Sequence, residues 1–259
     1  MIEKQENGSA TIQWLGQMGL LIKKGDTTLC VDYYASYDDT RQTAAPIPAE
    51  ELTGITAFLG THDHLDHIDH DAWKIWARTN PDARFIFPRI HRKAILADGI
   101  SEENAIGLND GETYDIGEFT IHAIAASHEF LNRDPKTGLY QYLQYIIEGD
   151  GVRIHHAGDT VRYEGMLAKV KAFGDIDVQL LPINGRDAKR YRNNCIGNMT
   201  YQEAADFAGD TGTKMVIPGH WDMFADNSAD PNEFADYIDV KYKGRLRCLI
   251  PSVMEVITI

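Results

Sequence analysis

The segment Gly60-Thr61-His62-Asp63-His64-Leu65-Asp66-His67-Ile68-Asp69 follows the short apolar run Ile55–Leu59. The apolar run has no room for a helix, so it predicts a buried strand. Three imidazoles and several carboxylates crowd the end of this strand, where they would gain little from packing. Neutral imidazole nitrogens and carboxylate oxygens suit zinc, manganese or iron. The segment therefore predicts a metal site, and the alternative is a solvated, histidine-rich turn.

The spacing within the segment suggests two metal positions. His62 and His64 are two residues apart, so in an extended loop their side chains project to the same side. Asp66 and His67 follow and can turn toward a second position.

The rest of the chain alternates short apolar runs with Gly, Asp and Asn turns. Its 259 residues, 43% hydrophobic and 25% charged, suit one large α/β domain over residues 1–259. We expect strands at Thr11–Leu15, Leu20–Lys23, Thr28–Val31, Ile55–Leu59, Arg84–Phe87, Ala105–Leu108, Glu112–Tyr114, Phe119–Ala125, Tyr142–Glu148, Arg153–Ala157, Val178–Leu181, Met215–Ile217, Arg247–Ile250 and Met254–Ile257. We expect helices at Asp71–Arg78, Arg89–Ala97, Gly165–Phe173, Thr200–Ala208 and Pro231–Tyr242. Thr200 with Glu203 three residues later is a capping-box signature. The pattern indicates two packed sheets with helices outside.

Charge and composition narrow the partners. The formal net charge is −14, and an acidic surface repels phosphates, so we expect no nucleic-acid partner. No apolar stretch is long enough to cross a bilayer, and the start MIEKQENGSA lacks an apolar signal core. We therefore expect a cytoplasmic protein without a membrane partner. Cys30, Cys195 and Cys248 are scattered, which predicts free thiols. The oligomeric state stays open, and a homo-oligomer is compatible with the sequence.

The pattern HxHxDH resembles the signature of the metallo-β-lactamase superfamily. The wording of residues 61–69 resembles its L-ascorbate-6-phosphate lactonase-like branch, and the resemblance extends from Trp14-Leu15-Gly16 to Pro218-Gly219-His220. It implies an α/β fold, the four-layer αββα sandwich, with one or two metal ions at the edge of the two sheets. Two departures stand out: Gln17 replaces a histidine that is frequent in related hydrolases, and some members carry an acidic residue where His128 falls.

The resemblance also implies the remaining ligands. His128, Asp159 and His220 each follow an apolar run and match, in order, the third ligand of the first metal, a bridging aspartate and a last histidine. The implied partition is His62, His64 and His128 on one metal, Asp66, His67 and His220 on the other, and Asp159 between them. It calls for two divalent ions, zinc or manganese first, with iron compatible. Such a pair would hold a hydroxide at neutral pH, and Asp66 and Asp159 are the residues assigned a catalytic role.

Asn184 and Arg186 are the candidates for binding substrate. They follow the expected strand Val178–Leu181, whose end borders the metal cleft in the superfamily. A guanidinium is well shaped to hold a phosphate or carboxylate, so a small anionic substrate is expected. Lys189, Arg190 and Arg192 form a charge cluster that is equally well explained as surface. Residues 196–200 lead into a helix whose first amides could receive an anion.

The remaining histidines are assigned no role. We expect local hydrogen bonds for His155 and His156 and an exposed position for His70, and the sequence places no polar cluster around His91 or His122.

Four functions are compatible with these residues. The first is a metal-dependent hydrolase that opens a lactone or similar ester of a small, optionally phosphorylated metabolite. The second is a phosphodiesterase or ribonuclease with the same metals, which the acidic charge disfavours. The third is a di-iron redox protein, whose relatives typically carry Glu at the position of His64. The fourth, a metal-binding protein without catalysis, is disfavoured by a complete ligand set.

Overall fold

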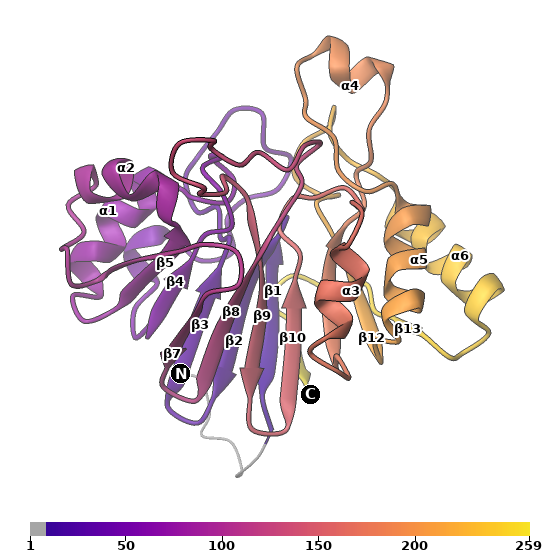
Figure 1. Ribbon diagram of the computed structural model, residues 1–259, viewed down its shortest axis with the longest axis horizontal. Helices are drawn as coiled ribbons and strands as arrows, with labels where there is room; N and C mark the ends of the chain where they lie inside the picture. Colours follow the sequence, from indigo (N-terminus) through magenta and orange to yellow (C-terminus); the bar gives the residue numbers. More distant parts are fainter. Residues whose placement is uncertain (1–8) are drawn as a thin grey trace.

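Two seven-stranded sheets form the centre of the computed structural model, which describes residues 9–259 (Figure 1). The polar start of the chain, on which the expectation of a missing signal core rested, therefore lies almost entirely outside the described residues. In spatial order the first sheet contains β14 (Val256–Thr258), β1 (Thr11–Gly16), β2 (Gly19–Lys24), β3 (Thr27–Val31), β4 (Ala57–Leu59), β5 (Arg84–Pro88) and β6 (Ala105–Leu108). The second contains β13 (Arg247–Cys248), β12 (Met215–Gly219), β11 (Val178–Pro182), β10 (Val152–His156), β9 (Leu143–Gly149), β8 (Phe119–Ala125) and β7 (Thr113–Ile116).

The main core lies between the two sheets. Inward-facing side chains such as Ile12 and Leu29 of the first sheet join Ile121, Tyr145 and Ile154 of the second in one buried cluster. The alternation of buried and half-buried positions along β8 is the period-two pattern expected of a strand with one face on a core. Removing this apolar surface from water is the main force that holds the sheets together.

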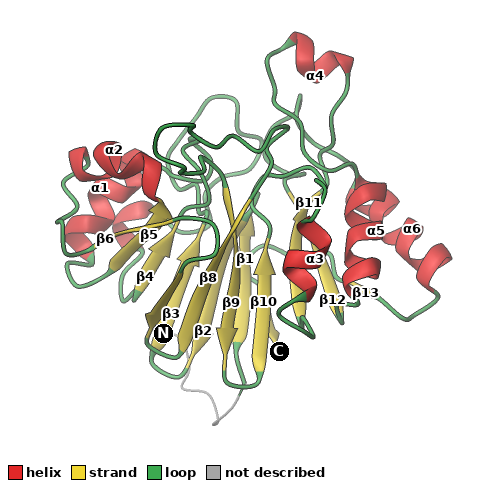
Figure 2. Cartoon of the chain, in the orientation of Figure 1, coloured by secondary structure: helices red, strands yellow, loops and turns green. Residues whose placement is uncertain are grey.

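Helices cover the outer faces of both sheets, and Figure 2 shows them in two groups with the strands between. Trp73 and Trp76 of α1 pack on the first sheet, while Phe207 and Phe234 lie in the cluster on the second. The expected four-layer αββα sandwich is therefore confirmed. The helices are α1 (His70–Thr79), α2 (Arg92–Ala97), α3 (Met166–Lys171), α4 (Ala188–Arg192), α5 (Tyr201–Thr211) and α6 (Pro231–Tyr242), with 3₁₀ turns at Ala49–Glu51 and Arg89–His91.

Most expected elements are present, with shifted ends. The capping box predicted at Thr200 is present, because its side chain accepts from the Glu203 amide and the Glu203 carboxylate accepts from the Thr200 amide. One helix was not expected: α4 stands away from the sandwich on its own loop (Figure 2). The three cysteines are free thiols, as expected. Within residues 9–259 no helix combines the length and apolarity needed to cross a membrane.

Strand direction explains where the polar residues gather. β3 to β6 run parallel to one another, and so do β10 to β13. Parallel strands end at the same edge of a sheet, so the residues that follow them meet there. The loop of residues 60–69 follows β4, Asp159 follows β10, and His220 follows β12. His128 follows β8, which pairs antiparallel with β9 as β9 does with β10, so β8 ends at that edge too.

Candidate metal centre

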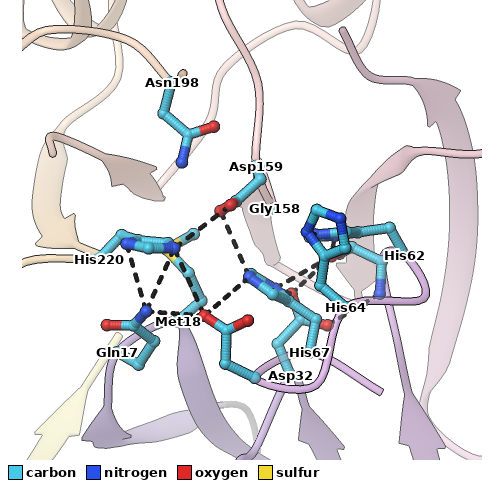
Figure 3. Close-up of polar contacts among 12 residues, drawn as sticks. Gln17, Met18, Asp32, His62, His64, His67, Gly158, Asp159, Asn198 and His220 are labelled. Carbon is cyan, nitrogen blue, oxygen red and sulfur yellow. Dashed lines mark hydrogen bonds and ion pairs between the residues drawn. The ribbon is translucent and has the colours of Figure 1, made fainter. Parts of the chain in front are cut away.

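The seven predicted ligands lie together at the shared edge of the two sheets. Their nitrogen and oxygen atoms form three overlapping clusters, each with ligand atoms within 4.8 Å of one another. We call His62, His64 and His128 the first group, and Asp66, His67 and His220 the second group; a third cluster joins His62 and His67 with Asp159. Figure 3 shows Asp159 between His220 and the histidines of the 62–67 loop. This grouping agrees with the partition that the sequence resemblance implied.

The first group consists of neutral imidazoles. Burial lowers the pKa of His62 and His64, and it lowers the pKa of His128 to about 4. His62 Nε2 lies 2.9 Å from His64 Nδ1. His128 Nδ1 is 3.2 Å from the Gly197 carbonyl oxygen and can donate to it, which leaves Nε2 facing Asp159 Oδ2 at 3.5 Å. Neutral nitrogens aimed at one another are expected around a cation and unfavourable without one.

The second group has the spacing of ligands around one ion. The Nε2 atom of His220 lies 3.5 Å from Asp66 Oδ2 and 3.3 Å from Asp159 Oδ2. The Nε2 atom of His67 lies 3.6 Å from Asp66 Oδ2 and 3.4 Å from Asp159 Oδ1. Ligand atoms at about 2.0–2.1 Å from a tetrahedral ion are roughly 3.3–3.4 Å apart. The four side chains therefore surround a space of the right size for a small divalent cation.

Two observations show that this set fits a cation. His67 Nε2 and Asp159 Oδ1 are buried without a hydrogen-bond partner, a costly arrangement for polar atoms unless something binds them. Burial opposes a charge on His220, yet the Asp159 and Asp66 carboxylates raise its pKa to about 10. For His67 too, burial is outweighed by Asp159, Asp66 and Asp32, and the pKa is raised. The carboxylates of Asp66 and Asp159 therefore favour a positive charge between His67 and His220.

Asp32, at the end of β3, supports the ligands and was missed by the sequence reasoning. Its Oδ2 atom lies 2.7 Å from His67 Nδ1 and accepts the Thr61 hydroxyl at 2.6 Å, while Oδ1 accepts the Thr61 amide at 2.8 Å. Thr61 Oγ1 in turn lies 3.1 Å from His62 Nδ1. One buried carboxylate therefore orients a ligand of each group. The signal was available, because Asp32 is a polar residue directly after an apolar run, as Asp159 is.

Close backbone packing also shapes the site. Gly158 has φ +55°, and a Cβ atom there would lie 2.8 Å from Thr61 Cβ. Only glycine tolerates both the left-handed conformation and this approach. The loops that carry Asp159 and His62 are thereby held against each other.

The side chains of the two predicted substrate residues, Asn184 and Arg186, bind neighbouring residues of the chain. Asn184 is buried, accepts from Asn198 Nδ2 at 3.0 Å and donates to Asn227 Oδ1 at 2.8 Å, so its amide serves its neighbours. The Arg186 guanidinium forms a two-pronged ion pair with Glu203, at 2.6 and 2.7 Å, and donates to the Asn198 carbonyl. The substrate roles of Asn184 and Arg186 stay predictions, and the two terminal nitrogens of the Arg186 guanidinium are already paired with Glu203.

A cavity of about 210 Å³ opens onto the metal groups. Five predicted ligands contribute to its wall, and the other lining residues are Asn194, Cys195, Ile196, Phe224 and Asn227. Among the described residues that line it there is no lysine or arginine. Two members of the basic cluster of the α4 loop pair with other residues: Lys189 with Asp226, and Arg190 with Asp187, Asn227 and the Ser228 carbonyl.

Of the other histidines, His155 and His156 make local hydrogen bonds, as expected, whereas His70 is half-buried and paired with Asp63 and Asp98 rather than exposed. His155 Nε2 lies 2.7 Å from Gln144 Oε1, and His156 Nε2 lies 2.7 Å from the Met18 carbonyl. His122 contacts Glu148. His70 and His91 both face Asp63, which lies between two ligands of the first group.

A four-layer sandwich with histidine and aspartate groups at one sheet edge defines a protein of the metallo-β-lactamase class. Comparison with known proteins agrees: a family model described as "Beta-lactamase superfamily domain" matches residues 30–221. The chain belongs to this superfamily and is a metal-dependent hydrolase within it.

Three similar proteins illustrate the relationship. A metal-dependent hydrolase of Pyrococcus horikoshii is 30% identical, aligned over 86% of this chain and 89% of its own. A Salmonella newport protein named "Probable L-ascorbate-6-phosphate lactonase" is 26% identical, over 95% of this chain and 78% of its own. The solved structure of a metallo hydrolase from Ignicoccus hospitalis superposes with a TM-score of 0.76 at 22% identity, covering 97% of this chain and 99% of that one.

Proposed function

We propose that the protein hydrolyses a lactone or similar ester of a small metabolite, with two divalent ions held by the first and second groups. The observation that carries the proposal is the convergence of seven candidate ligand residues at one sheet edge, five of which line a small cavity. Seven ligands are too many for one tetrahedral ion. Zinc and manganese suit the imidazole and carboxylate donors best, and iron is compatible. When bound, such ions polarise a carbonyl oxygen and make water a stronger nucleophile.

The residues of this chain have defined tasks in that reaction. The first group would hold one metal ion through neutral imidazole nitrogens. Asp159 faces both groups, because its Oδ2 atom lies 3.5 Å from His128 Nε2 and 3.3 Å from His220 Nε2. Asp66 contributes to the cavity wall and remains ionised, since His67 and His220 hold its pKa low against the effect of burial. Asp66 and Asp159 would therefore supply the negative charge that holds the ions at the cavity.

The residues that line the cavity indicate which kind of substrate it suits. Asn194 and Asn227 offer amide groups, while Cys195, Ile196 and Phe224 offer apolar or weakly polar contact. These residues suit a compact, uncharged ester or lactone ring. A phosphate on the substrate was predicted to meet Arg186, but the pairing of Arg186 with Glu203 gives that part of the prediction no support.

The test is turnover of two substrate panels by the protein reconstituted with manganese or zinc. We expect hydrolysis of small lactones, with phosphorylated and unphosphorylated members compared, and little hydrolysis of phosphodiesters. Faster turnover of phosphodiesters would replace the lactonase proposal by the phosphodiesterase alternative. Optical spectra of the iron-loaded protein under oxidising and reducing conditions would show whether the redox alternative holds instead.

A further inference from the structure

Gln17 connects the two sheets beside the second group. It lies in the turn between β1 and β2 and is 1% exposed. The backbone N–H of Gln17 donates to Asp222 Oδ1 at 2.8 Å, and its backbone carbonyl accepts from the backbone N–H of His220 at 3.1 Å. Both Gln17 (φ +53°) and His220 (φ +60°) adopt the left-handed conformation, which is strained for residues other than glycine. Strain of this kind persists where the surroundings fix it, and it gathers at functional sites.

The side chain of Gln17 ends among the ligand atoms of the second group (Figure 3). Its Nε2 atom lies 2.8 Å from Asp66 Oδ2, and 3.1 and 3.2 Å from the two ring nitrogens of His220. These separations are as short as those among the ligand atoms themselves. The Nε2 atom of Gln17 is therefore one of the atoms that surround the cation position.

The oxygen of the Gln17 side-chain amide makes no hydrogen bond in its present orientation. Gln17 Oε1 is buried and has no hydrogen-bond partner. A half turn of the amide exchanges its oxygen and nitrogen, and it would give Oε1 the place next to Asp66 and His220 that Nε2 now holds. That orientation is unfavourable beside a bare carboxylate and favourable beside a cation.

We propose that Gln17 belongs to the second cation site and binds the ion through Oε1. The inference rests on the proposed two-ion site and goes beyond its seven residues. A carboxamide oxygen is a neutral, hard ligand, so it adds coordination without adding charge to a group that already contains Asp66 and Asp159. Oxygen ligands of this kind favour manganese or magnesium over zinc. Gln17 would therefore bias the second site toward a harder metal.

The test is calorimetric titration of the metal-free protein with Mn²⁺ and with Zn²⁺, followed by elemental analysis. Gln17→Asn keeps the amide and the left-handed conformation, which Asn adopts readily, but shortens the reach. Gln17→Glu keeps the length and replaces the amide by a carboxylate. Gln179→Asn is the matched control, because Gln179 is also buried beside a histidine, His155, yet lies outside both groups. Thermal unfolding of the metal-free variants reports on the fold separately.

We expect Gln17→Asn to weaken one of the two Mn²⁺ sites by roughly tenfold or more, to weaken Zn²⁺ less, and to leave the other site unchanged. Gln17→Glu should bind that ion at least as tightly as the natural protein, and Gln179→Asn should match the natural protein. If Gln17→Glu binds more weakly, the amide acts as a hydrogen-bond donor to Asp66 and the proposal is overturned. Unchanged affinities in Gln17→Asn overturn it too. Should Gln17→Asn lose the fold, Gln17→Glu decides alone. Absent lactone turnover with both ions bound would refute the proposed substrate and leave this inference intact.

Discussion

Asp32 and His67 form a hydrogen bond of 2.7 Å between two side chains that have no solvent exposure. The carboxylate accepts the proton of His67 Nδ1 and so directs Nε2 toward Asp66 and Asp159. Asp32 comes from the end of β3 and His67 from the loop after β4, so the bond fixes the metal-binding loop to the sheet. Hydrogen bonds of this kind orient histidine ligands and raise their basicity.

Replacing Asp32 by Asn should weaken metal binding. Asn keeps an oxygen for the Thr61 amide but presents an NH₂ group to His67 Nδ1, which favours the wrong tautomer. We expect metal affinity to fall roughly 10–100-fold, measured by calorimetric titration of the metal-free protein. Circular dichroism is the control for the fold. A variant that folds and binds both ions with natural affinity would show that Asp32 does not orient His67.

Replacing Gly158 by Ala should destabilise the protein by about 1–3 kcal/mol, because the new Cβ atom would meet the Thr61 side chain at 2.8–2.9 Å. Gly212→Ala is the matched control: Gly212 also has a positive φ (+77°), but a Cβ atom there would have no neighbour within 4 Å. Urea unfolding measures both. Equal losses of stability would mean that backbone conformation alone, and not the close approach to Thr61, requires glycine at position 158.

Replacing Arg186 by Ala should reduce stability and should affect charged and uncharged substrates alike. The Arg186–Glu203 pair is about one third exposed, so solvent screens it and its loss should cost roughly 0.5–1 kcal/mol. Glu203→Gln is the companion variant, since it removes the same pair from the other side. Steady-state kinetics on a lactone and its phosphorylated analogue provide the check. A rise in KM confined to the phosphorylated substrate would instead establish Arg186 as the phosphate-binding residue first predicted.

His70 should titrate far above the usual histidine range. Its hydrogen bond to Asp63 and that to Asp98, acting against partial burial, raise its pKa to about 9. Because the folded-state pKa exceeds the unfolded one, about 6.5, the stability contributed by His70 is complete below pH 6.5 and is lost as pH rises through 9. His70→Gln should therefore lower the free energy of unfolding most at pH 6 and least above pH 9. An NMR titration that places the His70 pKa near 6.5 would contradict this.

The sequence was sufficient to predict the sandwich and the gathering of the seven candidate ligand side chains at one sheet edge. Strands such as Phe119–Ala125 carry clear alternation, and the polar residues that follow them fall at one edge because the strands share a direction. The helix α4 was missed because Ala188–Arg192 is short and has no buried residue, so no apolar periodicity marks it.

Side-chain pairing was beyond the sequence. Arg186 and Glu203 are seventeen residues apart, and nothing in their spacing shows that the guanidinium meets a carboxylate rather than a substrate. Gln17 and Asp66 are forty-nine residues apart, and their contact depends on how the two sheets pack. Ligand histidines are recognisable by clustering, whereas the residues that hold them come singly from distant strand ends.

Counting the metal ions bound per chain tests the central claim most directly. The metal-free protein is reconstituted separately with manganese and with zinc, freed of excess metal, and analysed for metal and protein content. Because two groups of ligands share Asp159 between them, we expect two ions per chain with the preferred metal. At most one ion per chain with either metal would contradict the two-ion site.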